Sequence, residues 1–133
     1  MKISSMKILM VHADKEERGR LAIMLARFEH SIAFTNKIDV FDLKLDAYDL
    51  IIVDEDLSDG PGYVFLKQLS SKYRAKTILM SNSDKKERSF CQSSMCIYEC
   101  MKKPVKPMDL AVVVCDFFVS FYLSDNNLAS LSC

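Results

Sequence analysis

Three polar residues that lie far apart in the chain carry the side chains needed to hold a phosphoryl group. Asp54, Ser81 and Lys103 each follow a short apolar run. A carboxylate can act as a nucleophile, a lysine neutralises charge on phosphoryl oxygens, and a hydroxyl donates a hydrogen bond to one of them. The three residues therefore predict phosphoryl chemistry at Asp54, provided that the fold brings them together.

Each of these residues also has a purely structural explanation. Asp54 could be an acid that ends a strand and is solvated there, and Lys103 could be a surface lysine like Lys102. Ser81 is also a common residue where a strand passes into a turn. The functional interpretation therefore depends on their placement in space and not on any one residue.

Short apolar runs alternate with amphipathic segments along the chain, which indicates successive βα units. Such units build a parallel sheet between two layers of helices, and the carboxyl ends of its strands share one edge. The three polar residues would meet at that edge. We expect strands at 7–11, 31–35, 50–54, 77–80 and 97–101. We expect one helix to begin at Asp14, one to follow the turn at 59–62, and three more to span 37–46, 84–95 and 108–123. In the first helix, the spacing predicts one buried stripe of Leu21, Met24, Leu25 and Phe28.

The composition is that of a single globular domain. Half of the 133 residues are hydrophobic, and 18 lysines and arginines balance 18 aspartates and glutamates. No bulk charge draws such a domain to a polyanion, so we expect no direct nucleic acid binding. We expect the domain to span residues 1–123 and residues 124–133 to form a flexible tail.

The cysteines and the apolar runs indicate in which cellular compartment the protein is expected. The five cysteines are irregularly spaced and no secretory signal is present, which predicts reduced thiols in a cytoplasmic protein. The longest apolar run, residues 110–123, contains Asp116 and is shorter than the roughly 20 residues that a membrane span needs. The sequence therefore predicts no membrane segment.

The ordered set of motifs resembles the receiver domain of two-component response regulators over roughly residues 6–122. The matching pieces are the run KILMV, the run YDLIIVD that ends on Asp54, then Gly62, Ser81 and the pair Lys103-Pro104. The resemblance implies a flavodoxin-like (CheY-like) three-layer α/β sandwich with a five-stranded parallel sheet, (βα)5. It also implies that Asp54 accepts phosphate from a sensor histidine kinase, supported by Ser81 and Lys103, and that the Lys103–Pro104 bond is cis.

One departure from the family affects magnesium. The family places two adjacent acids after the first strand to hold this ion, whereas this chain has His12-Ala13. Magnesium requires oxygen ligands in near-octahedral geometry. Asp54, the carbonyl of Asp56 and, through water, Asp14 would remain, so we expect Mg²⁺ binding to be weak or absent. A transition metal held by His12, Asp14 and Asp54 is a less favoured alternative.

A second departure concerns the switch position. Cys100 stands where the family usually carries an aromatic residue that swings between buried and exposed positions. Cysteine is too small for the same movement. Redox sensing through Cys91, Cys96 or Cys100 is an alternative role.

The last helix predicts an interaction surface. Apolar residues cover almost its whole circumference, although only about half of a helix can face its own sheet. We expect Val112, Phe117, Phe118 and Phe121 to form an interface for a second copy or a partner protein. Coverage by a C-terminal region beyond this sequence is the alternative.

Three functions remain open. The leading hypothesis is a non-enzymatic receiver in a two-component phosphorelay, with Asp54 as the phosphoacceptor and impaired magnesium binding. The alternative is a phosphorylation-independent pseudo-receiver that acts as a protein-interaction or dimerisation module. A flavin- or nucleotide-binding enzyme is disfavoured, because no glycine-rich loop follows the first strand.

Overall fold

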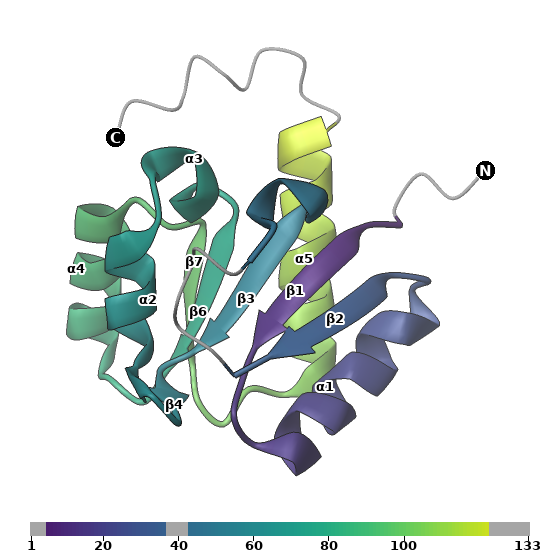
Figure 1. Ribbon diagram of the computed structural model, residues 1–133, viewed down its shortest axis with the longest axis horizontal. Coiled ribbons are helices and arrows are strands. Elements are labelled where there is room, and N and C mark those ends of the chain that lie inside the picture. The colour runs from purple at the N-terminus through teal and green to yellow at the C-terminus, as the bar shows by residue number, and fades with distance from the viewer. Residues whose placement is uncertain (1–4, 37–42, 123–133) are drawn as a thin grey trace.

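Five parallel strands form the centre of the protein (Figure 1). The computed structural model describes residues 5–36 and 43–122. The sheet has the order β2-β1-β3-β6-β7, with every neighbouring pair parallel. Its strands are β1 (Lys7–Val11), β2 (Ser31–Thr35), β3 (Leu50–Asp54), β6 (Thr77–Ser81) and β7 (Glu99–Lys102). This confirms the predicted α/β class and the five parallel strands.

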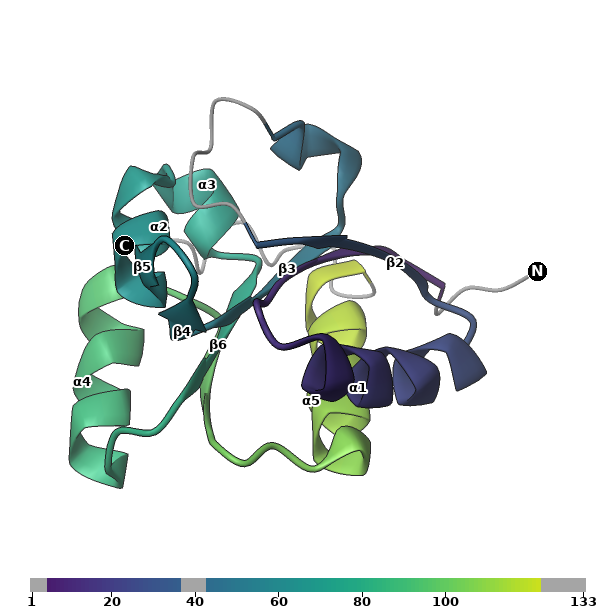
Figure 2. The same cartoon turned by 60° about the horizontal axis from the view of Figure 1, so that its bottom comes forward.

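Alternation along the strands divides the core into two layers. Ile8, Met10 and Ile52 contribute to the layer that includes α1 (Lys15–Arg27) and α5 (Pro107–Tyr122). The residues between them, such as Leu9, belong to the layer that includes α2 (Gly62–Gln68), α3 (Ser71–Arg74) and α4 (Lys85–Met95). Figure 2 shows the two groups of helices against opposite faces of the sheet. Strands buried on both faces explain the continuous apolar runs.

Helix α1 begins where the sequence predicts it. The Asp14 side chain accepts hydrogen bonds from the backbone N–H groups of Glu16 and Glu17, which satisfies donors that the helix cannot pair itself. The predicted stripe is correct at Leu21 and Leu25, which are fully buried, and Met24 packs against them partly exposed. Phe28 is wrong as a stripe member, because the helix ends at Arg27 and Phe28 is 44% exposed.

The segment between β3 and α2 has more structure than the predicted turn. Strands β4 (Asp56–Leu57) and β5 (Gly60–Pro61) pair in an antiparallel hairpin, and Gly60 adopts a φ of 141° that favours glycine. The backbone N–H of Gly62 then donates to the carbonyl of Glu55 at 2.7 Å and begins α2.

Helix α5 requires a correction to the predicted interface. Phe117 and Phe118 are buried in the core, and Phe121 packs against it partly exposed. Their assignment to an exposed interface is wrong for Phe117 and Phe118, because the largest side chains fill the space under the sheet. Val112 is 60% exposed, so its place in an interface stays a prediction.

Three smaller expectations differ from the structure. The helix expected at 37–46 lies partly outside the described residues, which contain only a 3-10 turn, Leu45–Ala47, in this region. Strand β7 begins at Glu99 instead of Ile97. Among the described cysteines Cys96 is disulfide-bonded and the others are free thiols. The expectation of uniformly reduced cysteines is wrong at Cys96, because spacing along the chain does not reveal which cysteines folding brings together.

The helices of residues 5–36 and 43–122 include none with the length and apolar character needed to cross a bilayer. Residues 110–122 of the long apolar run belong to α5, whose inner face is part of the core. Its hydrophobicity is therefore explained in part by packing against the sheet.

Two glycines give a matched test of how tightly α2 is seated against β3. A Cβ added at Gly62 would lie 2.4 Å from the backbone oxygen of Asp54, whereas one added at Gly19 in α1 meets nothing within 4 Å. We expect Gly62→Ala to lower the free energy of unfolding by about 1–3 kcal/mol through overpacking. Gly19→Ala should raise it by up to about 1 kcal/mol through helix propensity. Urea denaturation measures both values, and a Gly62→Ala protein as stable as the wild type would contradict the seating.

Candidate functional site

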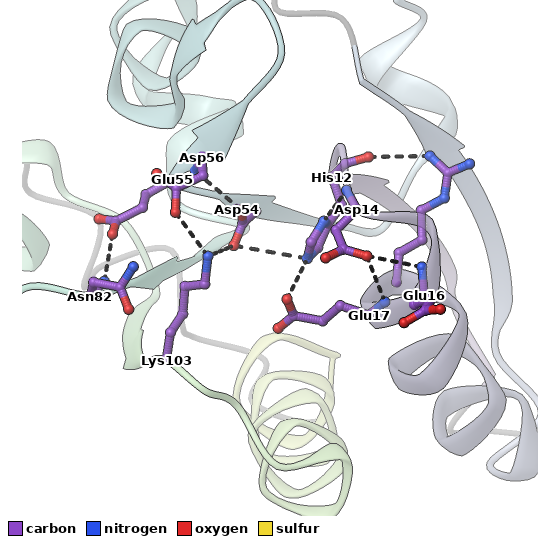
Figure 3. A network of polar contacts seen from close by, with 10 residues as sticks. His12, Asp14, Glu16, Glu17, Asp54, Glu55, Asp56, Asn82 and Lys103 are labelled. Carbon is purple, nitrogen blue, oxygen red and sulfur yellow. Dashed lines mark hydrogen bonds and ion pairs between the residues drawn. The ribbon is translucent and has the colours of Figure 1, made fainter.

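The predicted site residues come together at the carboxyl edge of the sheet. Asp54 ends β3 and lies beside Met80 of β6, so that Ser81 is next to the same position. Lys103 follows β7 and reaches back so that its Nζ lies 2.8 Å from Oδ1 of Asp54. Figure 3 shows the Lys103 side chain pointing at Asp54. The register of three parallel strands thus produces the contact that the sequence predicted.

Asp54 is a buried carboxylate whose oxygens are both engaged. The residue is 1% exposed. Its Oδ2 accepts a hydrogen bond from the backbone N–H of Asp56 at 3.1 Å, and its Oδ1 is paired with Lys103. The pairing is ionic, because among the described residues Oδ1 accepts no well-aligned hydrogen bond. A buried charge is costly unless it is paired, so Asp54 depends on Lys103.

Lys103 is shared between two carboxylates. Its Nζ donates a hydrogen bond to Oδ2 of Asp56 at 3.1 Å, in addition to pairing with Asp54. Burial by itself would lower the pKa of Lys103, but the two carboxylates outweigh burial and raise it. Lysine therefore stays charged at neutral pH. The Lys103–Pro104 peptide bond is cis, as the sequence resemblance implied.

His12 lies beside Asp54, at a position where receiver domains usually carry an acid. It is 1% exposed, and its Nδ1 accepts a hydrogen bond from the backbone N–H of Asp14 at 3.1 Å. This bond assigns the ring proton to Nε2. Nε2 lies 3.8 Å from Oδ1 of Asp54 and 3.6 Å from Oε2 of Glu17, and has no hydrogen-bond partner among the described residues. The imidazole is thus a buried, close neighbour of the carboxylate (Figure 3).

These residues do not fit a magnesium ion. Asp14 is exposed and its Oδ1 caps α1, which lowers the pKa of its carboxyl through the backbone hydrogen bond from Glu17. Ala13 offers no ligand, and both oxygens of Asp54 are engaged. Within the described part of the chain, no three histidine, cysteine or acidic side chains are arranged to hold a metal. Magnesium prefers carboxylate and carbonyl oxygens in near-octahedral geometry, and the side chains described here offer it fewer than an adjacent pair of acids would.

Glu55 is a site residue that the sequence did not reveal. The acidic segment after Asp54 predicts solvated side chains, yet Glu55 turns inward. Its Oε1 accepts a hydrogen bond from the Ser81 hydroxyl at 2.7 Å, and its Oε2 accepts one from the backbone N–H of Asn82 at 2.6 Å. Ser81 is therefore at the predicted edge, but its hydroxyl is bonded to Glu55. No local sequence signal distinguishes Glu55 from its acidic neighbours.

The predicted switch position is a buried thiol. Cys100 lies on β7, and burial raises the pKa of its thiol to about 12. Such a thiol is almost entirely protonated at neutral pH and is a poor nucleophile. This argues against redox sensing at Cys100.

A cleft of about 610 Å³ opens next to the Glu55–Ser81 contact. Tyr63 and Phe90 line it together with Leu79 and Cys91, and Phe90 is 74% exposed. The cleft therefore combines an apolar wall with the polar residues at the start of α4. The cleft is a surface at this edge of the sheet to which another molecule could bind.

The Asp54–Lys103 pair predicts a clear stability pattern. Lys103→Met leaves Asp54 buried without its cation. Loss of one partner of a buried ion pair costs about 3–5 kcal/mol, and we expect a loss of about 3 kcal/mol in the free energy of unfolding because Lys103 is partly exposed. Lys106→Met, at an exposed position, should change it little. The double variant Asp54→Asn/Lys103→Met should recover much of the loss. Urea denaturation at pH 7 measures all three, and equal effects of Lys103→Met and Lys106→Met would contradict the dependence.

Comparison by sequence yields no match to a family model and no similar curated protein. Comparison by structure does identify relatives of the fold. A two-component response regulator from Clostridium difficile has a TM-score of 0.74 at 22% identity, covering 89% of this chain and 98% of that chain.

Two further solved structures agree with it. The signal receiver domain of a signal transduction histidine kinase from Syntrophus aciditrophicus has a TM-score of 0.74 at 20% identity, covering 91% of this chain and 96% of its own. The non-phosphorylated HemR receiver domain from Leptospira biflexa has a TM-score of 0.73 at 17% identity, covering 84% of this chain and 93% of its own. The chain therefore has the CheY-like fold of response regulator receiver domains.

Proposed function

We propose that this domain is a non-enzymatic receiver module in a two-component-type signalling pathway, and that it works by protein contact without magnesium-dependent phosphorylation. The observation that carries the proposal is the placement of His12. Nε2 of its buried imidazole lies 3.8 Å from Oδ1 of Asp54. Lys103 already neutralises the charge of this carboxylate. Phosphoryl transfer to a carboxylate relies on a metal ion to balance the charge of the phosphoryl oxygens. The side chains at this edge do not provide for one.

A second candidate is phosphorylation of Asp54 by a sensor histidine kinase. It is favoured by the Lys103 ammonium at 2.8 Å, which could stabilise an added phosphoryl group. It requires Asp54, which is 1% exposed, to become accessible to a phosphodonor. This requirement makes it the weaker candidate.

The partner that we propose is another signalling protein or a second copy of the chain, in the cytoplasm. Helix α5 offers an apolar stripe for this contact, made of Met108, Val112, Cys115 and Val119, all exposed. Their spacing of four, three and four residues places them on one face of the helix, as in helices that pack against other helices. We call this set the α5 stripe.

A small phosphodonor separates the two candidates. Incubation with acetyl phosphate and magnesium should leave the intact mass of the wild type unchanged, because no metal balances the phosphoryl charge. The double variant His12→Asp/Ala13→Asp restores two acids after β1 and should acquire one phosphate. Adding Asp54→Asn to that variant should abolish the adduct. A phosphate on Asp54 of the wild type would reject the first candidate in favour of the second.

The α5 stripe is tested by the oligomeric state. Sedimentation at high protein concentration should show a dimer that Val112→Glu converts to monomer, since a charge would have to be buried in the contact. Ile23→Glu is the control, because Ile23 is equally exposed on α1, outside the stripe. A wild type that is monomeric throughout, or equal effects of the two variants, would contradict dimerisation through α5.

A further inference from the structure

The Glu55 carboxylate joins β3 to the segment between β6 and α4. It accepts the Ser81 hydroxyl at 2.7 Å with one oxygen and the backbone N–H of Asn82 at 2.6 Å with the other. We call this arrangement the Glu55 clamp. Both bonds are charge-assisted, and the bond from Ser81 belongs to a residue that is almost fully buried. Figure 3 shows the Glu55 side chain pointing away from Asp54 and toward Asn82.

The clamp uses donors that lie beside Asp54. Asp54 pairs with Met80 in the sheet, and the backbone N–H of Glu55 donates to the carbonyl of Met80 at 3.0 Å. Ser81 is the next residue. Because a serine hydroxyl carries one proton, its donation to Glu55 leaves none for an oxygen attached to Asp54. The hydroxyl oxygen also accepts the backbone N–H of Ser83 at 3.0 Å, which fixes its orientation further.

We propose that Glu55 is a positioning residue that acts as a built-in anion. It occupies the Ser81 hydroxyl, which would otherwise donate to a phosphoryl group on Asp54, together with the neighbouring Asn82 amide, and so holds the segment 81–83 in one hydrogen-bonded arrangement without phosphate. This inference rests on the proposed function, in which signalling does not require phosphorylation. It assigns to one side chain of this chain the role that an added phosphate would otherwise fill.

The segment held by the clamp leads directly into α4. Asp84 caps that helix through the backbone N–H of Glu87, and Arg88 donates to the carbonyl of Ser83 at 2.7 Å. Lys102 donates to the carbonyl of Asn82 from the β7 side. The clamp also forms part of the wall of the cleft that contains Phe90. A fixed clamp therefore keeps the start of α4 and this cleft in one arrangement.

Amide hydrogen exchange in the full chain tests the clamp. In Glu55→Ala the N–H of Asn82 loses its acceptor, and we expect its exchange to accelerate by at least about tenfold while the amides of β6 stay protected. Glu87→Gln is the matched control, because it removes a negative charge that lines the same cleft without touching Ser81 or Asn82. It should exchange like the wild type. Unchanged exchange at Asn82 in Glu55→Ala would overturn the proposal.

Inorganic phosphate then tests whether Glu55 occupies an anion position. Titration should shift the Asn82 amide resonance of Glu55→Ala in a saturable manner and restore its protection, with no such effect in the wild type or in Glu87→Gln. Absence of the shift, or an equal shift in all three proteins, would overturn the proposal. If Glu55→Ala does not fold, Glu55→Gln replaces it. Its single amide oxygen can accept only one of the two bonds, so we expect either faster exchange at Asn82 or a weakened Ser81 bond. The absence of both changes would overturn the proposal.

These results are independent of the phosphodonor experiment on the wild type. A phosphate adduct on Asp54 together with an intact clamp would reject the proposed function and leave the Glu55 contact standing. An absent adduct together with unchanged exchange in Glu55→Ala would reject the clamp alone.

Discussion

The buried carboxylate of Asp54 is the constraint on which the rest of the site depends. A charge on a residue that is 1% exposed must be balanced nearby, and Lys103 does so from the end of β7, two strands away, at 2.8 Å. This requirement ties the end of β3 to the segment after β7. It also explains why His12, a side chain that can be buried without a charge, is tolerated next to Asp54.

The charges and hydrogen-bond donors at this edge of the sheet are paired by other residues of the chain, and this has a functional consequence. Lys103 supplies the positive charge, His12 occupies the space beside the carboxylate, and Glu55 takes the donors at Ser81 and Asn82. The Glu55 contact would have to be released before Ser81 and Asn82 could donate hydrogen bonds to a phosphoryl group on Asp54. A site of this kind is suited to maintaining one conformation, and the α5 stripe and the cleft near Phe90 are surfaces that such a conformation would present.

Much of this arrangement was predictable from the sequence. Apolar runs located the strands, and the rule that parallel strands end at one edge brought Asp54 and Lys103 together. The orientation of Glu55 was not predictable, because it depends on donors at Ser81 and Asn82, which lie on a neighbouring strand and the segment after it, and not on the local composition. The buried faces of α5 were not predictable either, since a helix that is apolar all round does not show which side meets the sheet, and Phe117 was misplaced for this reason.

A titration with magnesium, followed by amide and imidazole resonances, tests the central claim most directly. The claim is that Asp54 is balanced by groups of the chain and not by a metal. It predicts that millimolar magnesium leaves the resonances of His12, Asp56 and Lys103 unchanged. Saturable shifts confined to these residues would show that the ion binds at Asp54 and would contradict the account.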